Sequence, residues 1–296
     1  MEAQPQYFYT TQQLYFLQIR LQAITDICND IEKIVDGLGL DLYTEVINWE
    51  EMKDLQRAFI RSGVPHIDTP QDHAFFATMY QFATKHNIKY ILTGANYSTE
   101  CVRNPMEWMY YQSDSRQIRD IHKRFGDKAL STFPLTSIVW HKVWLPYFKR
   151  VKVIRPLDLV PYEKEAALQL LTNKFGWKSY PQKHFESRFT KFYESYWLPT
   201  RFGYDVRKVQ YSSLILTDQM TRSDALLALG NSSYDTSSIE EEIEFVANKL
   251  DFTSDELLLF IKAPLMKFSD YRNQQNLYKM GASVMRMLGL ERGGKR

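Results

Sequence analysis

Apolar residues in the first half of the chain follow two patterns, short continuous runs and helical spacings. Short runs rich in β-branched and aromatic residues predict strands at residues 40–47 and 88–93, and a strand with its exit loop at residues 151–160. Apolar positions at helical spacing predict helices at residues 49–60, 70–86, 115–125 and 162–175. Strands that alternate with helices at these distances predict a parallel α/β sheet.

The second half of the chain shows helical spacing throughout. We expect helices at residues 185–197, 206–218, 223–229, 239–250 and 255–261. Thr253 and Glu256 have the spacing of a capping box, and Thr221 with Asp224 has a weaker version of it. The pattern therefore predicts an α/β part up to about residue 160 and an all-helical part after it.

Composition and charge exclude several classes of protein. The chain is 44% hydrophobic and 24% charged, which is typical of a globular protein and not of a disordered one. The net charge of +2, from 37 basic and 35 acidic residues, argues against a dedicated nucleic-acid binder. Two cysteines cannot build a disulfide framework, and neither a C-x-x-C pair nor a ligand spacing among the six histidines predicts a metal centre.

Targeting signals are not recognisable in the sequence. No apolar run approaches the roughly 20 residues that cross a bilayer, and the first residues, MEAQPQYFYTTQQ, lack the basic start and apolar stretch of a secretion signal. We therefore expect a cytoplasmic protein without integral membrane association.

Two groups of polar residues stand at the ends of predicted elements, one at a helix start and one after a strand. Asp72 and His73 stand at the start of a predicted helix, where backbone N–H groups favour an anion, although Asp72 is also suited to cap the helix and His73 to pack locally. Gly94, Asn96 and Glu100 come directly after the strand at residues 88–93, where open α/β sheets place ligand-binding loops. These five residues are our candidates for binding a nucleotide and Mg²⁺. No G-x-G-x-x-G or Walker A loop is present.

Two further groups combine charges with aromatic residues. One contains Trp108, Asp114 and Arg116; a surface ion pair of Arg116 with Asp120 is the alternative interpretation there. In the other, the charged residues stand densely among aromatics, and a solvated helix face explains only the charges. That second group comprises Lys183, His184 and Glu186. Together with Arg222, whose guanidinium suits a diphosphate or carboxylate, these residues are candidates for a sugar-binding or domain-closing role.

Several stretches together resemble the N-acetyl sugar amidotransferase family, which includes WbpG-like proteins of lipopolysaccharide O-antigen biosynthesis. The resemblance covers roughly residues 30–265. Its segments are KIVDGLGLDLYTEVINWEEMKDLQ, PQDHAFFATMYQFATKHNIKYILTGANYSTE, DSRQIRDIHKRFG, KHFESRFTKFYESYWLPTRFGYDVRK and QMTRSDAL. The family is similar to PP-loop ATP pyrophosphatases, which implies ATP and Mg²⁺ as cofactors.

The resemblance implies an amidotransferase that converts the acetamido group of a nucleotide-linked N-acetyl sugar to an acetamidino group. Ammonia would come from a partner glutaminase and its ammonia-channelling, cyclase-type partner. The implied organisation is a divergent segment (1–28), an incomplete α/β nucleotide-binding domain (29–160), a helical domain (161–290) and a tail (291–296).

The chain departs from the family in one motif. The family's S-G-G-x-D-S loop after the first strand, which cradles pyrophosphate, does not occur in this sequence. We therefore expect a PP-loop-like parallel sheet that lacks its first strand and its PP-loop, with apolar residues of the runs at 40–47 and 88–94 poorly covered. The departure keeps two alternatives open: a non-catalytic scaffold that docks the glutaminase or cyclase-type partner, and a PP-loop tRNA-modifying enzyme.

Overall fold

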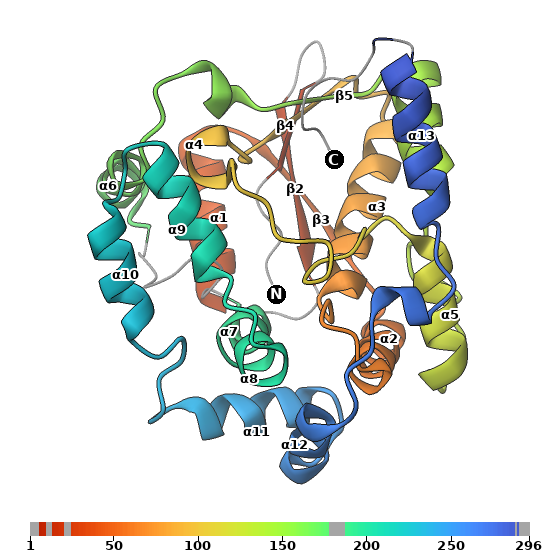
Figure 1. The fold of residues 1–296 in the computed structure, drawn as a ribbon. Coiled ribbons are helices and arrows are strands. Elements are labelled where there is room, and N and C mark those ends of the chain that lie inside the picture. The colour runs from red at the N-terminus through yellow and green to blue at the C-terminus, as the bar shows by residue number, and fades with distance from the viewer. Residues whose placement is uncertain (1–5, 10–13, 21–24, 178–186, 288, 290–296) are drawn as a thin grey trace.

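The computed structural model describes residues 6–9, 14–20, 25–177, 187–287 and 289, with side chains from residue 31 onward. Figure 1 shows a central sheet with helices around it, and the second half of the chain wraps along one side and beneath the sheet before returning to the far side.

The sheet has five strands in the order β3-β2-β1-β4-β5. They are β1 (Gln6–Tyr9), β2 (Leu14–Arg20), β3 (Asp41–Val46), β4 (Tyr90–Thr93) and β5 (Lys152–Ile154). β2 is parallel to β3 and β4 is parallel to β5, whereas β1 is antiparallel to both β2 and β4. Four strands therefore run in one direction, and the single reversed strand lies at the centre.

The predicted sheet is confirmed in part. The three predicted strands form and share one direction, and the exit loop expected within 151–160 contains a 3₁₀ turn at Pro156–Leu159. In place of the expected missing first strand, β1 and β2 precede β3 in the chain, and β2 pairs with β3 from Asp41 to Val46. Paired ladders satisfy the backbone groups that β3 and β4 would otherwise expose. The expected poor cover holds for Val46, which is 70% exposed, but not for the fully buried Ile91.

Three helices of the α/β part, α2, α3 and α5, lie where the sequence predicts them, whereas α1 and α4 were not predicted. The α-helices of this part are α1 (Thr25–Gly37), α2 (Trp49–Ser62), α3 (Thr69–Lys85), α4 (Tyr97–Glu100) and α5 (Ser115–Phe125). The Asn48 side chain caps α2 by accepting hydrogen bonds from the N–H groups of Glu50 and Glu51, and Gly63 ends the helix with φ 75°. A core of α2, α3, α5 and β4 residues, including Leu55, Phe59 and Ile91, holds these elements together.

From α6 onward the regular elements of the described residues are helical, as predicted. The α-helices of this part are α6 (Lys164–Phe175), α7 (Arg188–Phe192), α8 (Leu198–Phe202), α9 (Arg207–Leu216), α10 (Arg222–Gly230), α11 (Ile239–Lys249), α12 (Ser254–Lys262) and α13 (Gln275–Met287). Between α7 and α8 lies the π-helix η3 (Tyr193–Trp197). The predicted capping box at Thr253 and Glu256 is confirmed. A second core, centred on Trp197, includes Ile60 and Ile67 of the α/β part, so the two parts share buried apolar contacts.

Candidate functional site

The first predicted group lies at the start of α3, and its histidine has a structural role. His73 is 1% exposed. Its Nε2 accepts a hydrogen bond from the Thr136 N–H at 3.1 Å, so the ring proton is on Nδ1, which donates to the Gln112 carbonyl at 2.8 Å. Burial lowers the pKa of His73 to about 4, which keeps the ring neutral. His73 thus ties α3 to two loops, as the local-packing interpretation expects.

Asp72 lies in an acidic cluster, which we define as Asp68, Asp72, Tyr193 and Glu194. The Gln112 side chain donates a short hydrogen bond to Asp72 Oδ2. Desolvation raises the pKa of Asp72 well above its usual value, and the negative charges of Asp68 and Glu194 raise it further. The cluster joins the start of α3 to η3.

Tyr193 is the one member of the acidic cluster without a carboxyl group, and it is deeply buried. Its side chain is 1% exposed, and its hydroxyl has no hydrogen-bond partner among the described residues. Burial raises the pKa of this phenol, and the charges of Asp68, Glu194 and Asp72 add to the effect. A phenol in such surroundings stays protonated and keeps a hydrogen bond to donate.

The second predicted group is built into the joint between the two parts. Asn96 is buried and caps the short helix α4, because its Oδ1 accepts hydrogen bonds from the N–H and the hydroxyl of Thr99. The Ser98 carbonyl accepts bonds from Thr217 and Gln219 of the helical part. Beside Gly94 the space is open, since a Cβ built there meets no atom within 4 Å. Glu100 ends α4, and its charge contributes to the raised pKa of Tyr162, for which burial is the larger cause.

In the third predicted group, Trp108 and Asp114 make structural contacts and Arg116 is exposed. Trp108 stacks on Tyr204, with ring centroids 4.9 Å apart. Asp114 is fully buried and caps α5 through the N–H groups of Arg116 and Gln117. The Arg116 side chain is exposed. The alternative ion pair of Arg116 with Asp120 is wrong, because Asp120 pairs with Arg124 at 2.7 Å.

The remaining predicted residues do not enter the description of the site. Lys183, His184 and Glu186 lie outside the described residues. Arg222 begins α10 and is exposed. Asp72 interacts with η3 whereas the segment after β4 is held by α9, so the predicted nucleotide residues contact different portions of the helical part. Within the described ranges, no three His, Cys, Asp or Glu side chains are placed to hold a metal ion.

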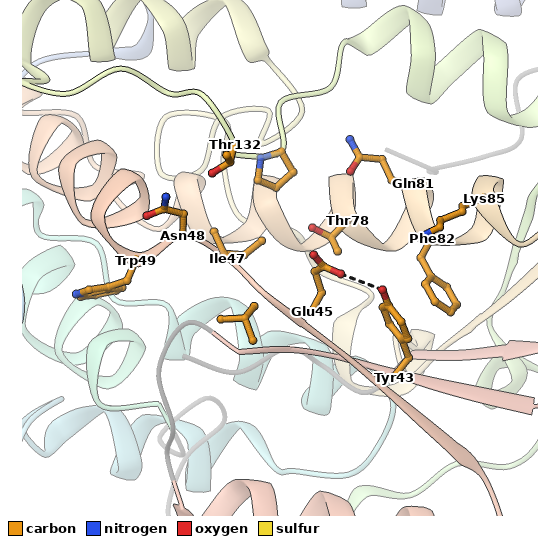
Figure 2. A pocket seen from close by; sticks show the side chains of 12 residues that line it. Tyr43, Glu45, Ile47, Asn48, Trp49, Thr78, Gln81, Phe82, Lys85 and Thr132 are labelled. Atoms are coloured by element: carbon orange, nitrogen blue, oxygen red, sulfur yellow. Dashed lines mark hydrogen bonds between the residues drawn. The ribbon is translucent and has the colours of Figure 1, made fainter.

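A pocket that sequence reasoning missed opens where β3 ends and α2 begins, and Figure 2 shows its side chains. Its volume is about 670 Å³. Its lining combines aromatic, amide, hydroxyl and charged groups: Tyr43, Glu45, Val46, Ile47, Asn48, Trp49, Thr78, Gln81, Phe82, Lys85, Thr132 and Pro134. None of these is a predicted site residue. The signal in the sequence is the position of Asn48 and Trp49 at a strand-to-helix turn, which is where α/β proteins bind ligands.

Contacts of Tyr43 and of Glu51 hold two walls of this pocket in place. The Tyr43 hydroxyl donates to Glu45 Oε2 at 3.1 Å, and the Tyr43 ring packs on Phe82 of α3 with centroids 4.3 Å apart. The Glu51 carboxylate, which is buried, binds the N–H groups of Thr132 and Phe133 and so fixes the loop on the opposite side. Aromatic planes beside amides and hydroxyls fit a sugar or nucleoside ring.

Comparison with protein families identifies the helical part. Residues 186–285 match the model of the LPS biosynthesis protein WbpG-like, C-terminal domain. This match supports assignment to the WbpG-like family. The WbpG-like domain contains η3, with Tyr193 and Glu194 of the acidic cluster, and α9, which holds the segment after β4. The match supports a role in lipopolysaccharide biosynthesis.

The comparison with curated proteins and the search of the described residues for membrane-spanning helices each found nothing. No curated protein matches the chain. Of the helices in the described ranges, none combines the length and apolar character that spanning a membrane requires.

Proposed function

We propose that the chain acts in lipopolysaccharide biosynthesis as an ATP-dependent amidotransferase of a nucleotide-linked N-acetyl sugar, with ammonia from a partner glutaminase. Transfer of AMP from ATP to the acetamido oxygen would release pyrophosphate and leave an imidate-like adenylate. Ammonia would then displace AMP to give the acetamidino group. Such substrates are cytoplasmic, which is where we expect the protein. The WbpG-like match carries this proposal.

The structure supports a division of the substrates between two places. The acidic cluster repels phosphate groups, but its carboxylates attract a cation such as ammonium. Asp72, whose Oδ2 accepts a hydrogen bond from the Gln112 side chain, is the carboxyl of this cluster that we expect to contact the ammonia nitrogen. The pocket at the end of β3 is suited to a sugar or nucleoside ring.

The triphosphate and Mg²⁺ are implied by the resemblance alone. Asn96 uses its amide oxygen to cap α4, so it fits a Mg²⁺ ligand poorly, and the sequence has no S-G-G-x-D-S loop. We therefore assign no step of the adenylyl transfer to a residue. Gly94 and Glu100 stay candidates for the nucleotide, and Glu100→Gln is expected to lower turnover without unfolding the protein.

The scaffold alternative is favoured by the missing phosphate loop, and one experiment separates the two functions. The purified chain is incubated with ATP, Mg²⁺, ammonium and nucleotide-linked N-acetyl sugars, and pyrophosphate release is measured. An amidotransferase releases pyrophosphate only when sugar is present. If no pyrophosphate appears but a WbpG-associated glutaminase binds in pull-down, the scaffold function replaces the enzymatic one.

The acidic cluster gives a sharper test of the amidotransferase. Asp72→Asn replaces one carboxyl oxygen of the acidic cluster by an amide NH₂ group, so we expect KM for ammonium to rise with KM for ATP unchanged. Asp255→Asn, an exposed site on α12, is the matched control. Equal effects on both substrates would exclude Asp72 from the ammonia side of the reaction.

A further inference from the structure

The π-helix η1 (Trp140–Phe148) and α13 form a surface that the proposed reaction does not use. η1 exposes Val143, Trp144, Tyr147 and Phe148, and α13 exposes Met280 and Val284. We call these six residues the apolar face. The two helices touch, because the Tyr147 hydroxyl lies 3.8 Å from the Met285 sulfur. In Figure 1 α13 is the dark blue helix on the edge of the molecule.

Aromatic residues dominate the part of the apolar face that η1 provides. Trp144 and Phe148 stack on each other with centroids 4.9 Å apart, and Phe148 is 65% exposed. Leu145 is the buried residue that anchors this helix in the core. Trp, Tyr and Phe are the residues that membrane interfaces favour, since their rings are apolar and two of the three carry a polar atom.

The charges close to η1 in the sequence have one sign. Residues 128–157 contain six basic residues and no acidic one, although the whole chain has 37 basic and 35 acidic residues. Two of the six, Lys128 and Arg155, form ion pairs with Glu50 and Asp158. The basic side chains nearest η1 in sequence are Lys142, Lys149, Arg150 and Lys152, of which all but the half-buried Lys149 are exposed. α13 also lacks acidic residues and carries Lys279 and Arg286. A nearly neutral protein thus concentrates positive charge around its exposed aromatic residues.

We propose that the apolar face and its basic border bind the surface of an anionic lipid bilayer. Exposed aromatic residues insert at the boundary of headgroups and acyl chains, and adjacent Lys and Arg attract the anionic headgroups. An apolar surface without basic residues would fit a protein partner equally well; the one-signed border favours the membrane. The association is peripheral and independent of the amidotransferase chemistry.

The test is flotation of the full chain with vesicles of phosphatidylglycerol and phosphatidylcholine, compared with phosphatidylcholine alone. We expect binding to the anionic vesicles, and weaker binding at high salt because salt screens exposed charges. Arg150→Glu with Lys152→Glu removes two attractive charges, and at about 1 kcal/mol for each basic residue the affinity should fall by at least about 30-fold. Lys208→Glu with Lys262→Glu, exposed positions on α9 and α12, makes the same change in net charge and should bind as the unaltered chain does.

A second pair of variants tests the apolar contribution. Trp144→Ser with Phe148→Ser should abolish flotation, whereas Leu226→Ser with Leu227→Ser, exposed on α10, should leave it unchanged. Circular dichroism and thermal unfolding check that each variant folds. The proposal is overturned if the unaltered chain does not float, or if the variants of the face float as well as their controls. If these substitutions change only the oligomeric state or the capture of an acidic protein, the surface binds protein instead.

Discussion

Asp114 offers the most direct way to separate a structural role from a functional one. Its buried carboxylate accepts four hydrogen bonds. Oδ1 receives the N–H groups of Arg116 and Gln117 at the start of α5, and Oδ2 receives the Tyr110 hydroxyl at 2.8 Å and the Gln274 N–H at 2.6 Å. Asp114 therefore fastens α5 to the chain that leads into α13.

Asp114→Ala removes all four acceptor contacts. Loss of the helix cap lowers the stability of the protein by about 1 kcal/mol. Tyr110 and Gln274 are then left as donors without an acceptor, and each lowers the stability by about 1–3 kcal/mol more. We expect the free energy of unfolding to fall by about 4 kcal/mol in total, measured by urea unfolding. Asp114→Asn keeps the capping oxygen but turns a donor toward the other two donors, so its loss should be intermediate.

Thr253→Ala is the control, because Thr253 only caps the exposed start of α12. It should cost about 1 kcal/mol. If Asp114→Ala costs no more than Thr253→Ala, the contacts to Tyr110 and Gln274 contribute nothing and the structural assignment is wrong.

Two further predictions concern charge. Asp72→Asn should raise the stability of the protein near neutral pH. The folded-state pKa of Asp72 is raised, so the unaltered protein loses stability as the pH rises above the unfolded-state pKa near 3.8. Equal melting temperatures of the two proteins at neutral pH would contradict this. His66 and His73 have folded-state pKa values of about 4 against the ordinary 6.5, so the unfolded chain binds more protons and stability should decline as pH falls from 6.5 toward 4. Urea unfolding at a series of pH values measures that decline, and a flat profile would show that the two rings are not held neutral.

Local signals in the sequence predict elements whose ends are fixed by side chains close in the chain. The strand at 40–47 and the helix at 49–60 match β3 and α2 closely, because Asn48 caps the helix and Gly63 ends it. The start and end of α5 follow in the same way from Asp114 and Gly126. Each of these boundaries depends on hydrogen bonds within a few residues, which periodicity and capping rules describe.

Elements that depend on the rest of the fold were not predicted. Pro146 lies inside η1, and a proline within an apolar run normally argues against a helix. The pairing of β1 with β2 and β4 joins residues of the divergent segment to strands far along the chain. In the same way the interaction of Asp72 with Glu194 depends on how the WbpG-like domain packs, so the sequence predicts the residue but not its partner.

Three of the residues chosen from the sequence, Asp72, Trp108 and Asp114, lie where the WbpG-like domain meets the α/β part. Trp108 stacks on Tyr204, Ser98 binds Thr217, and Asp72 faces Glu194. Such a joint is also where two-part proteins bind ligands, so position alone cannot separate the two roles. The sign of the change in stability when the residue is replaced can separate a structural role from a binding role. A residue whose bonds are all satisfied, such as Asp114, stabilises the joint, and its replacement costs stability. Asp72 is held among like charges at a cost to folding, and a carboxyl with a strongly shifted pKa is a candidate for binding or catalysis.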